Sequence, residues 1–272
     1  MENFLAQSLQ LTLYGPHLTC TGRHVTMLPE ALNQLDGLTV LHIHGCDHLV
    51  DLPASLGVLA NLVELSICWC PEVTEIPSSV CHLRALKRLS VRGARVLKQL
   101  PPLPSQLYML CLTSCSMLTE LPESLCQMKS LTTLDLRYCG SLTRLPEYLG
   151  QLSALHTLKL GGCSFLACLP ESIGQLSNLQ ELSLWECKLL KELPASVGQL
   201  EKITVLELPY RECTLMIPPP SLAASGTHGE IRSYLMARHT KLKLLLLVAA
   251  GKRRGRTRLP HELQNIVFAA TQ

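Results

Sequence analysis

The chain contains 272 residues, of which 47% are hydrophobic but only 4% are aromatic and 17% are charged. This composition excludes a chain that is disordered throughout, and it places most of the apolar mass on leucine, as expected where one small packing unit is repeated. Charge is uneven, with a net +7 in residues 211–272 and −4 in residues 1–210. The longest uninterrupted apolar stretch, Leu244 to Ala250, is far shorter than the roughly 20 residues that cross a bilayer. The first residues also lack a basic region followed by an apolar one, so neither a membrane protein nor a secreted protein is favoured.

The first candidate element lies near the N-terminus, where Leu9, Leu11 and Leu13 alternate with other residues. We expect them to form one degraded unit of the repeat that occupies the following residues. On this interpretation the chain is a fragment, or a relative that lacks its usual front half.

A leucine-type residue recurs at a regular interval through most of the chain. The spacing is 24 residues at every step except one, which is 21. The positions are Leu38, Leu62, Leu86, Leu107, Leu131, Leu155, Leu179 and Ile203. Within a unit such as 155–178, apolar residues first recur with a period of two, as in a strand with one buried face. A proline then follows, and the next apolar residues are spaced as in a single helical turn.

Each unit is therefore predicted to be a short strand followed by a return turn. One such unit cannot bury its leucines alone, so neighbouring units must stack and their strands must form one parallel sheet. The sequence predicts an α/β solenoid over residues 1–210, a curved horseshoe arc of about eight to nine 24-residue repeats. Parallel strands are expected on its concave face, and short helical or 3-10 turns on its convex face.

The repeat consensus is L-x-x-L-x-L-x-x-C-x-x-L-x-x-L-P-x-x-L/I/V-G-x-L, and it covers roughly residues 18–210. It resembles the leucine-rich-repeat region of plant intracellular nucleotide-binding disease-resistance proteins, mainly in the cysteine position and in Leu-Pro pairs such as Leu121-Pro122. Plant extracellular receptors have asparagine where this chain has the cysteine. The resemblance implies a recognition module in plant defence. The chain contains no G-x-x-x-x-G-K-S/T motif, so it holds no nucleotide switch of that type.

One unit departs from the consensus in the middle of the array. The unit that begins at Leu86 has Ala94 in place of the cysteine and is three residues short through residues 101–104. We expect the arc to tighten or kink at this point, where a partner could use the break.

Thirteen cysteines raise the question of a disulfide or metal framework. Six of them recur at one register of the repeat, at the inward-facing end of the strand: Cys46, Cys70, Cys115, Cys139, Cys163 and Cys187. We interpret them as a stacked column of buried thiols that contact backbone groups, as asparagine does in other repeats, in a reducing intracellular environment. The alternative is a zinc pair built from His42, His44 and Cys68 on adjacent strands, but no second Cys/His pair completes a tetrahedral site.

The strand residues between the leucines are the candidates for binding, because alternation sends them to the concave face. The leucine positions are nearly the same in every unit, but the residues between them vary greatly in charge, size and polarity. Aromatic and arginine side chains often anchor protein partners, so a protein-binding surface is predicted there. The candidate contact residues are Trp69, Arg88, Arg92, Asp135, Arg137, Tyr138, Lys159 and Trp185. The alternative is that these side chains are merely solvated and that Trp185 covers a neighbouring stem.

The repeat register ends after Tyr210. Residues 211–229 are predicted to be a linker, and residues 230–272 a basic C-terminal helical cap or tail that closes the last repeat. The alternatives are a nuclear-localisation or phosphate-binding patch at residues 252–256 and an F-box-like opening from Leu259, which is too short to form that domain.

Together these patterns predict a non-enzymatic protein-protein recognition module, in plant defence signalling by resemblance, that recognises a ligand or effector or inhibits a signalling partner. An open sheet offers no enclosed site for nucleophilic catalysis. The expected partner is a protein on the concave face, with no cofactor, metal, small-molecule substrate or membrane, and nucleic acid is not favoured. The expected location is the cytoplasm or, through the basic tail, the nucleus. The alternative is a stand-alone leucine-rich-repeat scaffold or a ubiquitin-ligase substrate adaptor.

Overall fold

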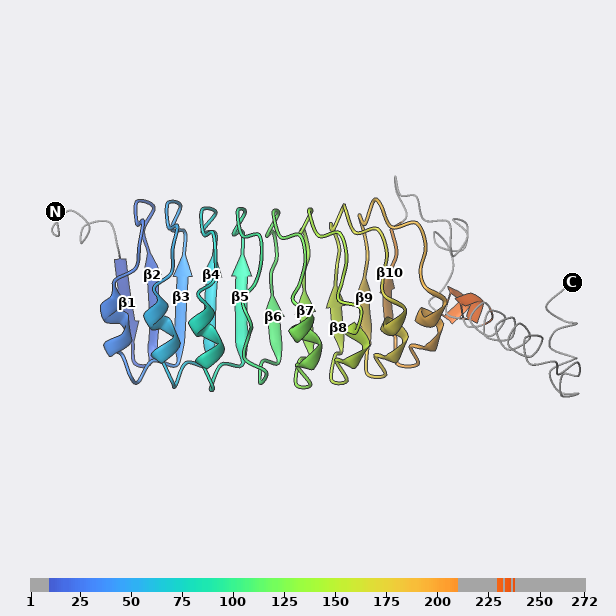
Figure 1. The fold of residues 1–272 in the computed structure, drawn as a ribbon, viewed down its shortest axis with the longest axis horizontal. Helices are drawn as coiled ribbons and strands as arrows, with labels where there is room; N and C mark the ends of the chain where they lie inside the picture. Colours follow the sequence, from blue (N-terminus) through green and yellow to red (C-terminus); the bar gives the residue numbers. More distant parts are fainter. Residues whose placement is uncertain (1–9, 210–228, 232, 236, 238–272) are drawn as a thin grey trace, which may run out of the picture.

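The computed structural model describes residues 10–209, 229–231, 233–235 and 237. Within them, one sheet contains ten strands in the order of the chain (Figure 1). The strands are β1 (Gln10–Tyr14), β2 (His17–Thr21), β3 (Val40–His44), β4 (Glu64–Cys68), β5 (Arg88–Arg92), β6 (Met109–Cys111), β7 (Thr133–Asp135), β8 (Thr157–Lys159), β9 (Glu181–Ser183) and β10 (Val205–Glu207).

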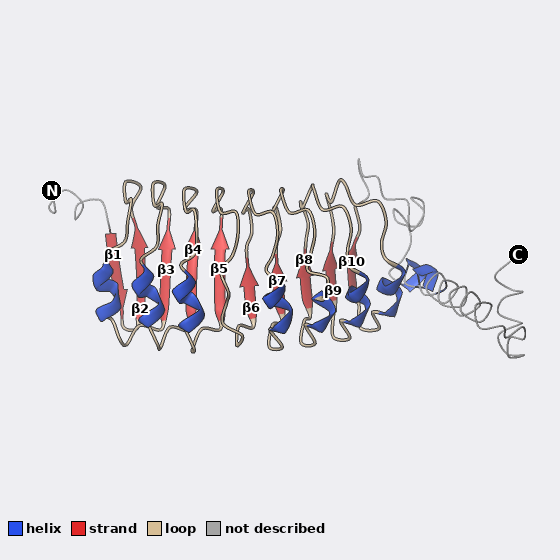
Figure 2. Cartoon of the chain, viewed as in Figure 1, coloured by secondary structure: helices blue, strands red, loops and turns tan. Residues whose placement is uncertain are grey.

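Seven short 3-10 helices lie on one side of this sheet in the same part of the chain (Figure 2). They are η1 (Glu30–Gln34), η2 (Ala54–Val58), η3 (Ser78–His82), η4 (Glu123–Gln127), η5 (Leu149–Gln151), η6 (Glu171–Gln175) and η7 (Ala195–Gln199). We call this side the convex face, and the sheet face turned away from the helices the concave face. The predicted alternation of strand and return turn is confirmed.

Strands β2 to β10 are parallel, and equivalent leucines form continuous rungs. Leu158 lies opposite Leu182, and Leu182 lies opposite Leu206. Because successive side chains in a strand point to opposite faces, these leucines enter a single core between sheet and helices while their neighbours stay on the concave face. Leu158 and Leu182 are completely buried there. The 24-residue spacing therefore sets the register of the whole sheet.

The return segments begin at the prolines of the Leu-Pro pairs. Pro194, for example, is the N-cap of η7 with φ of −60°, a value that the proline ring fixes in advance and that suits the start of a helix. Neighbouring helices approach so closely that a Cβ atom on Gly57 would lie 2.4 Å from the carbonyl oxygen of Ser79 in the next repeat. The glycine of the consensus thus allows adjacent helices to pack.

The short unit differs on its convex side and leaves the sheet unbroken. Arg88 of β5 lies opposite Met109 of β6, in the same register as the other strands. No 3-10 helix lies between β5 and β6. The three missing residues are therefore removed from the return segment.

The prediction for the N-terminus was wrong. Leu11 and Leu13 belong to β1, which runs antiparallel to β2 and is not a degraded parallel repeat. Gly15, with φ of 57°, and Pro16 reverse the chain directly into β2, so no residues remain for a return segment. Leu9 lies outside the described residues.

The last repeat is followed by helical residues at 229–231, 233–235 and 237. Ile231 and Leu235 are buried and belong to the same hydrophobic core as the repeats. Residues 210–228 and 238–272, which hold most of the predicted linker and the basic patch, lie outside the described residues. No described helix is long and apolar enough to cross a membrane.

Candidate functional site

The predicted contact residues fall into two groups on the sheet. The first group comprises Trp69, Arg88 and Arg92 in the repeats of β4 and β5, and the second comprises Asp135, Arg137, Tyr138, Lys159 and Trp185 in the repeats of β7 to β9. The repeat of β6 separates them and places Met109, Cys111 and Thr113 at the equivalent positions. Because neighbouring strands lie about 4.8 Å apart, β5 and β7 are roughly 10 Å apart.

A chain of polar contacts crosses the concave face in the first group. Nε2 of His42 lies 3.2 Å from Oε1 of Glu64, and Nε of Arg88 donates to Oε2 of Glu64 at 2.7 Å. Nη1 of Arg88 donates to the Tyr108 hydroxyl at 2.6 Å. Burial raises the pKa of Glu64, but hydrogen bonds from His42 and Arg88 outweigh that effect, so this pKa lies below its ordinary value. Arg88 is therefore held across three repeats before any partner is bound.

Arg92 is the predicted cation that has no carboxylate partner among the described residues. Its Nε donates to the Ser90 hydroxyl at 3.2 Å, and its side chain is exposed. The other predicted cations each form an ion pair, in Arg88–Glu64, Arg137–Asp135 and Lys159–Glu181. The guanidinium of Arg92 is thus available to an acidic group.

Asp135 positions Arg137 and does not itself face solvent. Its carboxylate accepts hydrogen bonds from Nη2 of Arg137 at 2.7 Å and from Nε at 3.0 Å. The residue is only 6% exposed, so it presents little surface to a partner and acts mainly through Arg137. One strand further, Nζ of Lys159 lies 3.1 Å from Oε1 of Glu181. Both cations of the second group are therefore oriented by carboxylates.

Two aromatic rings enclose a pair of glycines in the second group. The rings of Tyr138 and Trp185 are in edge-to-face contact, with centroids 5.2 Å apart, a favourable geometry for aromatic pairs. A Cβ atom on Gly161 would lie 2.2 Å from Nε1 of Trp185, and one on Gly162 would lie 2.8 Å from Cδ1 of Tyr138. The rings thus pack directly against glycine backbone, which fixes their positions.

Tyr138 and Trp69 occupy a backbone position that favours glycine. The residue before the column position, which holds a cysteine in six repeats and Ala94 in the repeat of β5, has a positive φ throughout the repeats of β3 to β9. These residues are Gly45, Trp69, Gly93, Ser114, Tyr138, Gly162 and Glu186. In the repeat of β7 this residue is the third in a turn closed by the hydrogen bond from Cys139 N–H to the Leu136 carbonyl. Bulky side chains are uncommon there and cost on the order of 1 kcal/mol.

The column cysteines have the structural role that the sequence predicts. All six are completely buried, and Sγ of Cys139 donates to the Leu112 carbonyl at 2.9 Å while Sγ of Cys163 donates to the Leu136 carbonyl at 3.1 Å. Burial raises the pKa of the Cys163 thiol, which keeps it protonated and unreactive. No cysteine in the described part of the chain forms a disulfide bond.

His44 and Cys68 lie opposite each other on β3 and β4, as their spacing predicts. The Cys68 thiol, however, lies 3.2 Å from the Ser66 hydroxyl, and His42 is engaged by Glu64. No group of three or more His, Cys, Asp or Glu residues in the described ranges could hold a metal ion.

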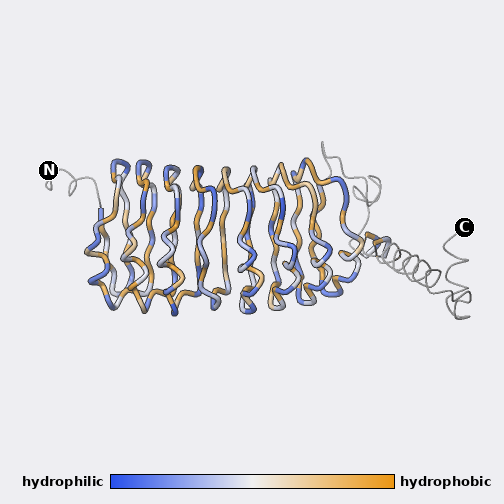
Figure 3. Tube along the Cα trace, viewed as in Figure 1, coloured by the Kyte–Doolittle hydropathy of each residue, from blue (hydrophilic) through white to orange (hydrophobic). Residues whose placement is uncertain are grey.

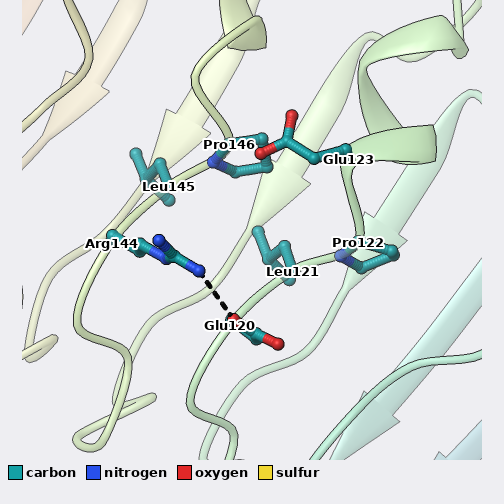
Figure 4. Close-up of a pocket in the computed structure, with 7 residues that line it drawn as sticks. All are labelled: Glu120, Leu121, Pro122, Glu123, Arg144, Leu145 and Pro146. Atoms are coloured by element: carbon teal, nitrogen blue, oxygen red, sulfur yellow. Dashed lines mark hydrogen bonds and ion pairs between the residues drawn. The ribbon is translucent and has the colours of Figure 1, made fainter.

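A pocket of about 200 Å³ lies outside both groups, between the Leu-Pro segments of two adjacent repeats (Figure 4). Its walls include the pairs Leu121-Pro122 and Leu145-Pro146. Arg144 Nη2 and Glu120 Oε2 form a 3.1 Å ion pair across it, with both side chains exposed. Such exposed pairs contribute little to stability, and the pocket is too open and small to resemble an enzyme site.

Sequence reasoning missed three exposed apolar residues in the loops that follow the strands. Met117, Phe165 and Leu189 each lie two positions after a column cysteine and are 43%, 58% and 43% exposed. Their common register was visible in the sequence. Strand alternation assigns only strand residues to a face, so it does not identify these loop residues.

Comparisons with known proteins agree with this architecture. The model of the Leucine Rich Repeat family matches residues 130–152 and 178–200. The leucine-rich-repeat domain of the type III effector XCV3220 (XopL) is similar in structure, with a TM-score of 0.57 and 24% identity over 71% of this chain and 76% of that one. The leucine-rich-repeat protein LIC12759 of Leptospira interrogans gives a TM-score of 0.53 and 27% identity over 75% of this chain, which spans 50% of the Leptospira chain. No curated protein matches.

Leucine-rich-repeat domains generally mediate protein-protein interactions, and they are typically non-enzymatic scaffolds whose extended inner surface binds the partner. The repeated strand and 3-10 turn, the continuous leucine rungs and the family match all point to the same architecture. The chain is built of leucine-rich repeats and folds as a leucine-rich-repeat solenoid.

Proposed function

We propose that this chain is a non-enzymatic recognition module that binds a protein partner through its concave face. The observation that carries the proposal is the second group, in which three adjacent repeats hold surface residues in fixed positions. Asp135 orients Arg137, Glu181 orients Lys159, and Gly161 supports Trp185. Such preorganisation favours binding, because less conformational entropy is lost when the complex forms.

We assign this module to plant defence signalling, where it recognises an effector or ligand or restrains a signalling partner. Support comes from the cysteine column and the Leu-Pro pairs, which are similar to those of plant intracellular disease-resistance proteins. We also propose a cytoplasmic location. Free, buried thiols such as Cys139 and Cys163 suit a reducing compartment.

Capture from plant cell extract with quantitative mass spectrometry tests the proposal. The purified chain is compared with Trp185→Ala and Lys159→Ala, and with Tyr148→Ala as a matched control. Tyr148 is 61% exposed and immediately precedes η5 on the convex side. We expect partners enriched by the wild-type chain and by Tyr148→Ala to be depleted roughly 30-fold with Trp185→Ala, the equivalent of about 2 kcal/mol for an interface hot spot.

The same comparison can contradict the proposal. Partners that bind both concave-face variants as well as the wild-type chain, but are lost with Tyr148→Ala, would place the interface on the convex side. Circular dichroism of each variant confirms that the solenoid is intact before binding is compared.

A further inference from the structure

The loops that follow strands β5 to β9 form a surface distinct from the centre of the concave face. We define this edge surface by the segments 92–98, 113–119, 137–143, 161–167 and 185–191. In Figure 1 these segments include the upper turns of the ribbon on the C-terminal side of each strand. Tyr138 and Trp185 belong both to the edge surface and to the second group, so the two surfaces adjoin.

The edge surface exposes apolar side chains in a row. Met117, Tyr138, Phe165 and Leu189 come from four successive repeats, and their exposed fractions range from 43% to 58%. In Figure 3 the upper turns of the first repeats are hydrophilic, whereas hydrophobic colour appears at the upper turns of later repeats. Exposed apolar side chains that gather on one side of a protein often mark an interaction site.

Backbone hydrogen bonds between repeats hold this row in place. The N–H groups of Met117, Phe165 and Leu189 donate to carbonyl groups of the preceding repeat, each at 3.2 Å. The acceptors are the carbonyls of Arg95, Gly140 and Ser164. Because each loop is bonded to its neighbour, the apolar side chains are presented at the fixed spacing of the repeat.

The edge surface carries mostly positive charge. Its five segments contain six cations, Arg92, Arg95, Lys98, Arg137, Lys188 and Lys191, and a single carboxylate, Glu186. The equivalent segments of the two preceding repeats, 44–50 and 68–74, contain two carboxylates and no Lys or Arg. Five of the six cations lie in the first and last repeats of the edge surface. Met117, Tyr138 and Phe165 lie in the three repeats between them, and Leu189 lies beside the last cluster.

We propose that the edge surface binds an acidic amphipathic segment of the protein partner. Apolar residues in the middle of that segment would pack on Met117, Tyr138, Phe165 and Leu189, and carboxylates at its two ends would meet the two clusters of cations. Five repeats span four strand spacings, about 19 Å, which is the length of a helix of roughly 13 residues. This inference rests on the proposed function, since it names the kind of partner segment that the module recognises.

Fluorescence anisotropy with defined peptides tests the inference. One probe is a labelled 16-residue helical peptide with leucine along one face and glutamate at both ends, and the second has lysine in place of every glutamate. We expect the glutamate peptide to bind at least ~10-fold more tightly, and more weakly as salt is raised, because the edge cations attract it.

Variants of the full chain assign the binding to the edge. Phe165→Ser combined with Met117→Ser removes apolar contact, and Arg95→Glu combined with Lys98→Glu reverses charge. Each pair is expected to weaken glutamate-peptide binding by roughly 10-fold. The matched control is Val58→Ser combined with Tyr148→Ser, which changes two exposed apolar residues of the convex side and is expected to leave binding unchanged.

Three results would overturn the inference: equal binding of both peptides, binding that both edge variants leave unchanged, or stronger binding to phosphatidylserine vesicles than to the glutamate peptide. The last would assign the edge surface to a membrane. Lys159→Ala alters only the concave face, so it distinguishes failure of the edge-surface inference from failure of the proposed function. If it abolishes capture of the native partner while the edge variants retain it, the edge inference fails and the concave interface stands.

Discussion

Replacing Gly161 by alanine tests whether the glycine positions Trp185. The new Cβ atom would lie 2.2 Å from the indole Cε2 and Nε1 atoms, whereas ordinary contacts are about 3.5 Å. The indole must therefore move by roughly 1.3 Å, which breaks its packing on the backbone and its edge contact with Tyr138. Overpacking of this kind costs about 1 to 3 kcal/mol, and we expect the lower end because Trp185 is half-buried and can move outwards.

Gly140→Ala is the matched control, because no atom lies within 4 Å of a Cβ atom there and the backbone is not left-handed. Alanine at such a site is expected to be neutral or to stabilise by up to ~1 kcal/mol through the unfolded state. Urea unfolding followed by circular dichroism should therefore give a lower midpoint for Gly161→Ala than for Gly140→Ala. Tryptophan emission of the folded protein should shift to longer wavelength only in Gly161→Ala. Equal midpoints and unchanged emission would refute the packing argument.

Three further predictions concern the thiols and one carboxylate. Cys163→Ala should lower the free energy of unfolding by about 1 to 2 kcal/mol, because it removes a buried hydrogen bond and leaves a small cavity. Cys168→Ala, at an exposed site, should change this free energy by less than about 0.5 kcal/mol. Equal effects of the two substitutions in urea unfolding would contradict the structural role of the cysteine column. At pH 8, iodoacetamide should modify Cys168 before Cys126, as followed by peptide mass mapping. Burial raises the pKa of Cys126 to about 11 and so reduces the fraction of its thiol present as reactive thiolate. Earlier modification of Cys126 would contradict its burial. Because the pKa of Glu64 is lowered on folding, its stabilising effect is present at neutral pH and is lost as pH falls through its folded-state pKa. Arg88→Met should therefore reduce the difference in unfolding midpoint between pH 7 and pH 3, and an unchanged difference would argue against this ion pair.

The leucine spacing was sufficient to predict most of the fold. Leu158, Leu182 and Leu206 form consecutive rungs as expected, because each repeat buries its leucines only against its neighbours. The N-terminal strand was misassigned because a period of two is the same in parallel and antiparallel strands. Its direction is set by the turn at Gly15 and Pro16.

The candidate site could be predicted only in part. Alternation identifies which residues face the concave side, but it gives no depth, so the burial of Asp135 beneath Arg137 was not foreseen. The position of the Trp185 side chain depends on Gly161, which lies 24 residues earlier in the chain. Phe165 was missed because the outward direction of its loop depends on a left-handed turn, which residue periodicity does not encode.

The left-handed residue before each column position also has a consequence for how this array changes under mutation. At Trp69 and Tyr138 the backbone has φ of 58° and 63°, values that glycine adopts without strain. Glycine occupies the same position at Gly45, Gly93 and Gly162, so replacing either ring by glycine would relieve backbone strain. We therefore expect the two rings to persist across lineages that keep the same partner, and to be among the first residues to disappear from copies in which recognition has been lost.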